Sequence, residues 1–134
     1  MTEKLERSEE EWRKELNDDE FAVCRQRATE AAFSGELLNN KTQGTYLCRC
    51  CEQELFSSET KFDSGTGWPS FWQPLTAECI EEVEDRSHGM QRVEVNCRRC
   101  DAHLGHLFPD GPDPTGMRYC INSVSLKMRP AETG

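Results

Sequence analysis

Apolar positions recur with a helical period only near the start of the chain. Trp12 and Leu16 lie four residues apart and follow Ser8-Glu9-Glu10-Glu11, which matches a helix capping box. A second short helix is predicted to begin at Asp18 or the next residue and to carry Cys24. Two interpretations stay open for this segment: a movable arm over a site, or helices that cover a sheet edge.

The rest of the chain has the shorter period of β-strands. Strands are predicted over residues 45–47, 77–84, 91–96 and 117–127, with a turn over residues 85–90. Short strands separated by turns predict a mainly β fold, with short helices at the N-terminus. The length predicts one domain over residues 1–134. It divides into a helical arm (residues 1–30), a β core (residues 31–126) and a tail (residues 127–134) that frays from Arg129.

Between Leu55 and Leu75 the pattern is irregular and rich in glycine and proline. This segment nevertheless carries five aromatic side chains: Phe56, Phe62, Trp68, Phe71 and Trp72. Aromatic residues in such a stretch are most often core, but they can also line a pocket on a rigid scaffold.

Composition and charge narrow the possible functions. Asp and Glu outnumber Lys and Arg 25 to 16, giving a net charge of −9, which disfavours binding to a phosphate backbone. No apolar run reaches the roughly 20 residues of a membrane span, and the glutamate-rich first residues do not resemble a secretory signal. We therefore expect a cytoplasmic protein that binds neither nucleic acid nor membrane.

Eight cysteines in a chain with only 35% hydrophobic residues suggest that something other than a hydrophobic core, such as a bound metal, helps to stabilise the fold. Two Cys-x-x-Cys pairs, Cys48/Cys51 and Cys97/Cys100, could supply the four thiolates of a closed tetrahedral zinc site. The alternatives are dithiol redox motifs or plain buried cysteines. Cys50 also lies in the first cluster, so the choice of ligands depends on the spacing rule.

A second group of residues points to thiol chemistry. On a strand, the period of two brings Arg118, Cys120 and Asn122 to one face. A guanidinium beside a thiol favours the thiolate, although a buried core cysteine is the simpler reading of Cys120 alone. His103 and His106 are candidate acid–base partners, because imidazole titrates near neutral pH and four cysteines already suffice for zinc.

Three stretches together resemble the signatures of a known family. Residues 61–71, Lys-Phe-Asp-Ser-Gly-Thr-Gly-Trp-Pro-Ser-Phe, resemble the signature loop of type B methionine sulfoxide reductases. Residues 97–112 and 118–126 resemble the other two signatures of this family, and the first cysteine pair fits its zinc-binding form. The similarity extends from about Ala31 to Leu126.

The resemblance implies a fold of two small antiparallel sheets with N-terminal helices, one structural zinc ion per chain, and reduction of methionine-R-sulfoxide, free or in proteins. The two sulfoxide epimers need separate enzymes. Cys120 would be the nucleophile and would become a sulfenic acid. The proton-transfer and positioning residues would be His103, His106, Asn122 and Arg118. Trp68 and Phe108 would contact the substrate, and thioredoxin would be the reductant of a monomeric enzyme.

The signature loop departs from the family pattern at one position. Many members have a resolving cysteine where this chain has Thr66, and threonine cannot form a disulfide. Either another thiol resolves the sulfenic acid, or the reductant attacks Cys120 directly. Cys24 is the favoured candidate, because an N-terminal arm can move, whereas Cys50 lies beside a zinc ligand and Cys79 lies on a predicted strand.

Two other classes of protein compete with the enzyme. One is a zinc-stapled binding module in which Trp68, Phe71 and Trp72 form an interaction patch and Cys120 is inert. The other is a redox switch that releases zinc when it is oxidised. The polar face around Cys120 and the pair of histidines favour the enzyme.

Overall fold

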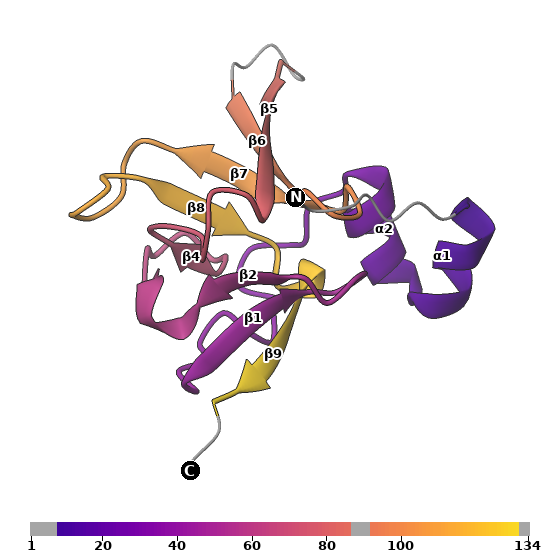
Figure 1. The fold of residues 1–134 in the computed structure, drawn as a ribbon, viewed down its shortest axis with the longest axis horizontal. Coiled ribbons are helices and arrows are strands. Elements are labelled where there is room, and N and C mark those ends of the chain that lie inside the picture. Colours follow the sequence, from indigo (N-terminus) through magenta and orange to yellow (C-terminus); the bar gives the residue numbers. More distant parts are fainter. Residues whose placement is uncertain (1–7, 87–91, 132–134) are drawn as a thin grey trace.

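Two antiparallel sheets and two N-terminal helices form the fold in the computed structural model, which describes residues 8–86 and 92–131 (Figure 1). In chain order the elements are α1 (Glu9–Glu15), α2 (Asp18–Gln26), β1 (Gly44–Cys48), β2 (Glu54–Ser57), the 3-10 turn η1 (Ser58–Thr60), β3 (Lys61–Phe62), β4 (Ser70–Phe71), β5 (Ile80–Asp85), β6 (Arg92–Cys97), β7 (His103–Phe108), β8 (Arg118–Ile121), the 3-10 turn η3 (Ser123–Ser125) and β9 (Leu126–Pro130). The predicted mainly β class, with two antiparallel sheets and N-terminal helices, is confirmed.

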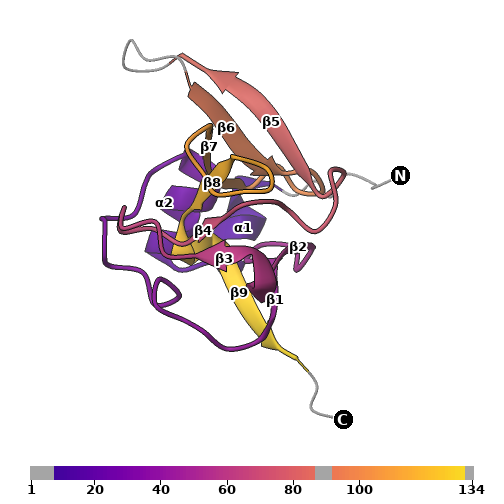
Figure 2. The same cartoon turned by 90° about the vertical axis from the view of Figure 1, so that its left-hand side faces the viewer.

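The two sheets differ in size. Within the described residues, one has the strand order β2-β1-β9 and the other β3-β4-β8-β7-β6-β5. Figure 2 shows the β5–β6 hairpin projecting away from the smaller sheet, at the opposite end of the molecule from β9. The turn predicted over residues 85–90 lies largely outside the described residues.

Both N-terminal helices begin with a capping box. The Ser8 hydroxyl accepts from the Glu11 N–H, and the Glu11 carboxylate accepts from the Ser8 N–H, as the sequence predicts. Asn17 and Glu20 repeat this arrangement at the start of α2. The Trp12 side chain is only 2% exposed, and α2 packs against β7 and η3. The helices therefore cover the ends of the sheets, as Figure 1 shows at its right-hand side.

Aromatic stacking joins the two sheets in the core. The Phe56 and Phe71 rings stack with their centroids 4.4 Å apart, and Tyr46 meets Phe71 edge-on at 5.1 Å. Phe56 belongs to β2 and Phe71 to β4, so each sheet contributes one ring to the stack. Two aromatics of the irregular segment are thus core residues, whereas Trp68 is half-buried.

The strand prediction was wrong in the C-terminal half. The single strand expected over residues 117–127 is divided by η3 into β8 and β9, which belong to different sheets. Residues 126–130 therefore pair with β1 instead of fraying. The sequence pattern also missed β7, which carries both candidate histidines, and the two-residue strands β3 and β4.

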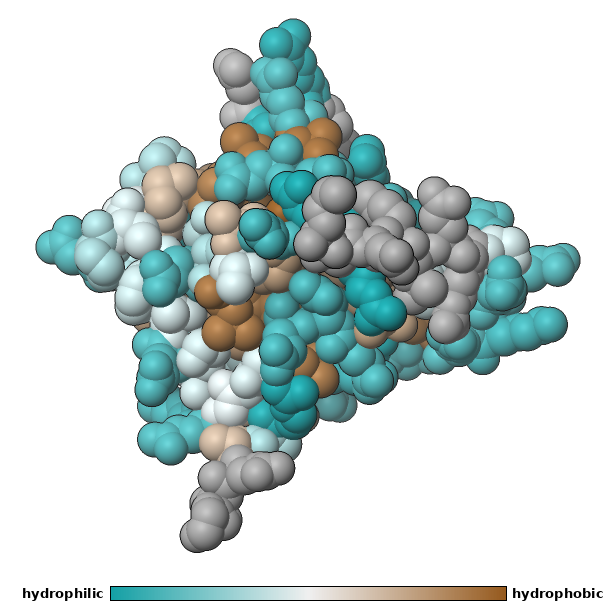
Figure 3. Space-filling model, in the orientation of Figure 1, coloured by the Kyte–Doolittle hydropathy of each residue, from teal (hydrophilic) through white to brown (hydrophobic). Residues whose placement is uncertain are grey.

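The surface agrees with the acidic composition. In the view of Figure 3 hydrophilic residues predominate, and hydrophobic ones form small separate patches. Among the described residues, none of the helices has the length and apolar character that crossing a membrane requires.

Candidate active site

Cys120 lies in the middle of a row of side chains that crosses four strands of the larger sheet. In the strand registers, Ser70 faces Cys120, Cys120 faces His106, and His106 faces Glu94. Directly opposed residues of antiparallel strands share a face and have Cβ atoms about 5 Å apart. The sheet therefore places a half-buried thiol next to an imidazole, with a carboxylate beyond it.

A β-bulge brings the two histidines together. Val95 pairs with Gly105, but Asn96 pairs with His103, so Leu104 is an extra residue in β7. Without this bulge, side chains three residues apart would point to opposite faces of the sheet. With it, the His103 and His106 rings lie 5.5 Å apart.

Only glycine fits at the bulge. The backbones of β7 and β8 approach so closely that a Cβ at position 105 would overlap the carbonyl oxygen of Cys120. Gly105 therefore sets the distance between the strand that carries the histidines and the strand that carries the thiol.

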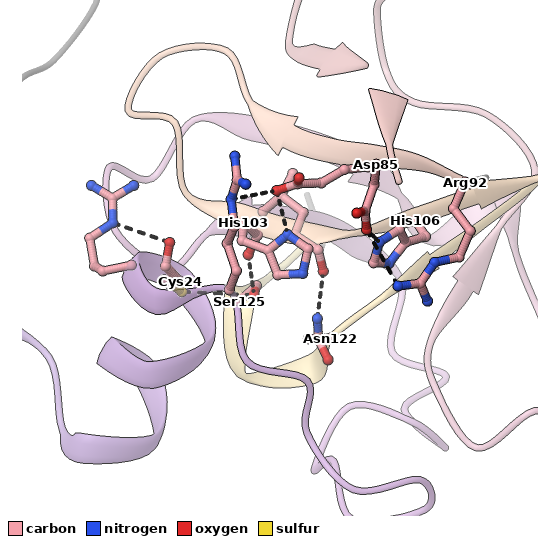
Figure 4. A network of polar contacts seen from close by, with 11 residues as sticks. Cys24, Asp85, Arg92, His103, His106, Asn122 and Ser125 are labelled. Atoms are coloured by element: carbon pink, nitrogen blue, oxygen red, sulfur yellow. Dashed lines mark hydrogen bonds and ion pairs between the residues drawn. The ribbon is translucent and has the colours of Figure 1, made fainter. Parts of the chain in front are cut away.

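Each histidine is held by a buried or half-buried carboxylate, as Figure 4 shows. His103 Nδ1 lies 2.9 Å from Glu94 Oε2, and His106 Nε2 lies 2.8 Å from Asp85 Oδ2. An arginine contacts each carboxylate in turn: Arg27 Nε is 3.3 Å from Glu94 Oε2, and an Arg92 nitrogen is 3.4 Å from Asp85 Oδ2. These contacts fix the orientation of both rings, as carboxylates do for catalytic histidines.

The two ring nitrogens of His103 differ in their contacts. A carboxylate only accepts hydrogen bonds, so Nδ1 carries the proton that is shared with Glu94. Burial lowers the pKa of His103, against the opposing effect of Glu94, and this favours the neutral ring. Nε2 is buried, and in the part of the chain that the structure describes it has no hydrogen-bond partner. His103 is therefore poised to exchange a proton through Nε2.

Asn122 lies just beyond the end of β8 and is fixed by three hydrogen bonds. Its backbone N–H and its side-chain Nδ2 both donate to the carbonyl of Leu104, the bulge residue, at 2.8 and 3.0 Å. Its Oδ1 accepts from the backbone N–H of Glu30 at 3.1 Å. The bulge thus orients the amide of Asn122 as well as the histidines.

Arg118 shares the face of Cys120 and is itself anchored. Its Nε and a terminal nitrogen donate to the two oxygens of Asp110 at 2.8 and 3.2 Å, and its guanidinium lies 4.4 Å from the centroid of the Phe108 ring. Asp110 raises the pKa of Arg118, so the guanidinium stays charged beside the thiol.

The thiol itself is not activated in the resting protein. Burial raises the pKa of Cys120, and this outweighs the lowering effects of Arg118 and of a hydrogen bond with Thr66, while Glu30 raises it further. The sequence predicted the direction of the Arg118 effect, but it missed the larger cost of burial. Cys120 is therefore a protonated thiol near neutral pH.

We expect the alkylation rate of Cys120 to keep rising with pH. An ordinary cysteine has a pKa of about 8.5, and the raised pKa of Cys120 predicts an increase of about tenfold from pH 7 to pH 8, because the thiolate fraction grows throughout this range. Iodoacetamide labelling followed by peptide mapping measures the rate, with Cys120→Ser as the control that identifies the labelled site. A plateau below pH 8 would contradict the raised pKa.

The signature loop brings hydroxyl groups to the thiol. Ser64 Oγ lies 2.8 Å from Thr66 Oγ1 and 2.7 Å from Ser70 Oγ. Thr66 also forms a hydrogen bond with the Cys120 thiol, so its side chain lies beside that sulfur. Trp68, at the end of the loop, donates its indole N–H to the carbonyl of Glu30 at 3.0 Å.

The four cysteines of the two pairs form a separate cluster. The sulfur atoms of Cys48, Cys51, Cys97 and Cys100 all lie within 4.8 Å of one another. Across the two pairs, the Cys51 and Cys97 sulfurs are 3.5 Å apart and the Cys48 and Cys100 sulfurs are 3.6 Å apart. A tetrahedral zinc ion with Zn–S bonds of about 2.3 Å separates its sulfurs by about 3.8 Å, so this set fits such an ion with little adjustment. Cys48 ends β1 and Cys97 ends β6, so a metal here would join the two sheets.

Sequence comparison identifies a family model and several similar proteins. The model of the SelR domain matches residues 16–130. The chain is 57% identical over 130 residues to a peptide methionine sulfoxide reductase MsrB of Pseudomonas aeruginosa, covering 97% of this chain and 98% of that protein. It is 56% identical over 129 residues to the MsrB of Acinetobacter baylyi (96% and 93% covered) and 53% identical over 129 residues to that of Saccharophagus degradans (96% and 96% covered).

The chain belongs to the type B methionine sulfoxide reductases. The resemblance found in the sequence is thereby confirmed, and so is the assignment of the chain as an oxidoreductase, which excludes the inert binding module. Several polar residues of this reductase's site were not predicted: Glu94, Asp85, Asp110 and Glu30. They come from distant strands or loops, and no local pattern in the sequence connects them with Cys120.

The three thiols outside both groups, Cys24, Cys50 and Cys79, have their own contacts, and none of those recorded for the described residues is with Cys120. Cys24 is 2% exposed on α2, with its sulfur 3.7 Å from Ser125 Oγ, and it interacts with Cys50 beside the metal-ligand cluster. Cys79 is buried, with its sulfur 3.2 Å from the carbonyl of Thr76. In this reductase, a disulfide between Cys24 and Cys120 would require α2 to leave its packed position.

Proposed function

We propose that this enzyme reduces the R epimer of methionine sulfoxide, free or in oxidised proteins, to methionine, with Cys120 as the nucleophile. The observation that carries the proposal is the register that sets the half-buried Cys120 directly opposite His106. Reduction of a sulfoxide needs a nucleophilic sulfur and a proton for the departing oxygen, and these two residues can supply both.

In the proposed step the Cys120 sulfur attacks the sulfoxide sulfur, and the oxygen passes to Cys120. The proton lost by the thiol reaches the oxygen through His103 or His106, each of which is held by a carboxylate. Methionine leaves and Cys120 becomes a sulfenic acid, so the cysteine gains the oxygen that the substrate loses. Arg118 stabilises the thiolate during the attack, and Asn122 positions the oxygen.

Two aromatic residues are proposed to hold the substrate. Trp68 and Phe108 are both half-buried near the thiol, from the signature loop and from the end of β7. Trp68 would provide a flat apolar wall for the methyl group. The cation–π contact between Arg118 and Phe108 would keep the second ring in place.

The metal in this proposal is one zinc ion, held by Cys48, Cys51, Cys97 and Cys100. Four thiolates leave no open coordination position, so zinc would stabilise the fold and take no part in the reaction. It would hold β1 of the smaller sheet against β6 of the larger one.

The sulfenic acid must then be returned to the thiol. A second thiol forms a disulfide with Cys120 and releases water, and the dithiol of thioredoxin reduces this disulfide. Cys24 is the internal candidate for this second thiol, at the cost of unpacking α2. Direct attack by thioredoxin needs no such movement, because Cys120 is half-buried rather than enclosed. We also propose that the enzyme is a cytoplasmic monomer that binds neither nucleic acid nor membrane.

A single turnover without reductant tests the reaction. Reduced, zinc-loaded protein is mixed with each epimer of methionine sulfoxide, and the methionine formed and the thiols lost are counted. We expect one methionine per chain from the R epimer alone. Two thiols lost indicate an internal resolving cysteine, whereas one thiol lost indicates a sulfenic acid that waits for the reductant.

Matched variants identify the residues involved. Cys120→Ser should form no methionine, whereas Cys79→Ser, which removes a buried thiol elsewhere, should form as much as the parent. If two thiols are lost in the parent and only one in Cys24→Ser, Cys24 is the resolving cysteine. Absence of methionine from both epimers would overturn the proposed function.

A further inference from the structure

Residues 30–37, called here the strap, bind two parts of the candidate site that come from distant regions of the sequence. At one end, the Leu37 N–H donates to Ser123 Oγ in η3 at 2.9 Å. In the middle, the Phe33 N–H donates to the carbonyl of Gly67 in the signature loop at 2.7 Å. The strap therefore bridges the segment that follows Cys120 and the loop that carries Thr66 and Trp68.

Glu30 makes the contacts that matter most for the site. Its backbone N–H donates to Oδ1 of Asn122, and its backbone carbonyl accepts from the indole of Trp68. One residue thus holds both the amide proposed to position the sulfoxide oxygen and the ring proposed to receive the methyl group. The distance between these two side chains depends on where the Glu30 backbone lies.

The Glu30 side chain fixes this backbone. Its Oε1 accepts from the Val124 N–H at 2.9 Å, inside η3, whose N-cap residue Asn122 makes no side-chain capping bond of its own. The carboxylate thus serves as a cap supplied from another part of the chain. It packs against Gly35, where a Cβ would lie 2.6 Å from Oε2, so the strap closes tightly over it.

The negative charge of Glu30 also affects the pKa of the Cys120 thiol. Among the described residues, the charged or titratable groups near Cys120 include Arg118 on its own strand, His106 with His103 on the next strand, and Glu30 on the strap. Glu30 raises the pKa of Cys120 and Arg118 lowers it. Burial raises the pKa of Glu30 itself, while the N–H groups of Val124 and Ser123 oppose this effect.

From these contacts we infer that Glu30 is a positioning residue that sets the spacing between Asn122 and Trp68 and thereby the fit of the R epimer. The inference rests on the proposed function. It assigns to the carboxylate a role through Asn122, Trp68 and η3, with no direct contact to substrate.

Three variants test this inference. Glu30→Ala removes the anchor and should raise KM for methionine-R-sulfoxide at least about tenfold, the scale of one lost hydrogen bond to a charged group, while kcat changes less. Glu30→Gln keeps an oxygen that accepts from the Val124 N–H, and it should restore KM to within about twofold of the parent. Glu36→Ala, an exposed change in the same strap, should leave both constants unchanged.

Alkylation of Cys120 gives a readout that needs no turnover. Glu30→Gln removes a negative charge near the thiol, so iodoacetamide should label Cys120 at least about twofold faster at pH 7.5 than in the parent or in Glu36→Ala. This measurement remains informative if Glu30→Ala fails to fold or if the parent does not reduce the R epimer.

The outcomes divide clearly. A raised KM in Glu30→Ala with rescue by Glu30→Gln supports positioning. Constants equal to those of Glu36→Ala, or a Gln variant as defective as the Ala variant, would overturn it. An unchanged labelling rate in Glu30→Gln would contradict the placement of the Glu30 charge beside Cys120. A parent that fails to form methionine while the labelling rate responds as expected would overturn the proposed substrate and not the placement of Glu30.

Discussion

Replacement of Cys97 by serine is expected to leave the chain without its metal and largely unfolded at 25 °C. The four sulfurs lie within 4.8 Å of one another at the ends of β1 and β6 and in the turns that follow them, so a bound metal would link the two sheets directly. A structural zinc site contributes about 10–16 kcal/mol in small domains, which is comparable to or larger than the typical net stability of about 5–15 kcal/mol. Metal analysis and thermal unfolding followed by circular dichroism measure the effect.

Cys50→Ser is the matched control for this change. Cys50 lies between Cys48 and Cys51 in the turn of the first pair and is half-buried, but it is outside the set of four. We expect this variant to retain one zinc ion per chain and to unfold within a few degrees of the parent. A Cys97→Ser protein that keeps its zinc and its melting temperature would show that the ligands have been assigned wrongly.

Replacement of Gly105 by alanine is expected to lower kcat/KM by about a hundredfold or more. The new Cβ would overlap the carbonyl oxygen of Cys120. Neither atom can rotate away, because the Cβ is bonded directly to the backbone and the oxygen is part of it. The strands β7 and β8 must therefore separate, which moves the thiol away from His106 and from the bulge. A misplacement of about 1 Å in an active site can cost about a hundredfold in rate. Overpacking should also lower the free energy of unfolding by about 1–3 kcal/mol.

Gly116→Ala is the control that distinguishes the steric overlap at position 105 from the backbone strain of placing alanine at a glycine position. Gly116 has a φ of 71°, but a Cβ there would meet nothing within 4 Å. Its replacement should cost about 1 kcal/mol of stability and leave kcat/KM within about twofold of the parent. Urea unfolding and steady-state kinetics, both measured where each variant is folded, compare the two. Equal activity in the two variants would mean that the spacing of β7 and β8 does not control the site.

The regeneration of Cys120 connects the site with the helices. Thr66 lies beside the thiol but cannot form a disulfide, and Cys24 is a buried residue of α2 whose sulfur lies near Ser125. The idea of a mobile N-terminal arm came from the sequence, where a short polar segment carries a cysteine. In the folded protein the same segment is held in place by the buried Trp12 and by the packing of α2 against β7 and η3. Any role of Cys24 therefore requires local unfolding, whereas direct attack by the reductant does not.

Local sequence signals were sufficient for the helices and for the set of four cysteines that lie together. A capping box involves residues three apart, so Ser8 and Glu11 can be recognised without any tertiary information. A Cys-x-x-Cys pair is likewise complete within one turn, and two such pairs in a single chain indicate a shared metal. The same holds for Arg118 and Cys120, whose common face follows from the period of a strand.

The remaining parts of the site depend on contacts between distant segments. The bulge at Leu104 reverses the alternation of β7, so the sequence pattern neither predicted this strand nor placed His103 and His106 on one face. The carboxylates of Glu94 and Asp85 become partners of the histidines only through strand register. The net pKa shift of Cys120 depends on its burial, which is a property of the packed protein.

The sequence by itself determined the two cysteine pairs that could hold a metal, the common face of Arg118 and Cys120, the helix starts and, through its signatures, the family. These features depend on residues only a few positions apart, and the local backbone geometry of a turn, strand or helix end is enough to bring their side chains together. Only the tertiary structure decided which carboxylates orient the histidines, why position 105 must be glycine, and how Glu30 reaches both Asn122 and Trp68. Those relations arise from strand register and loop packing, which bring together residues as many as 92 positions apart in the chain.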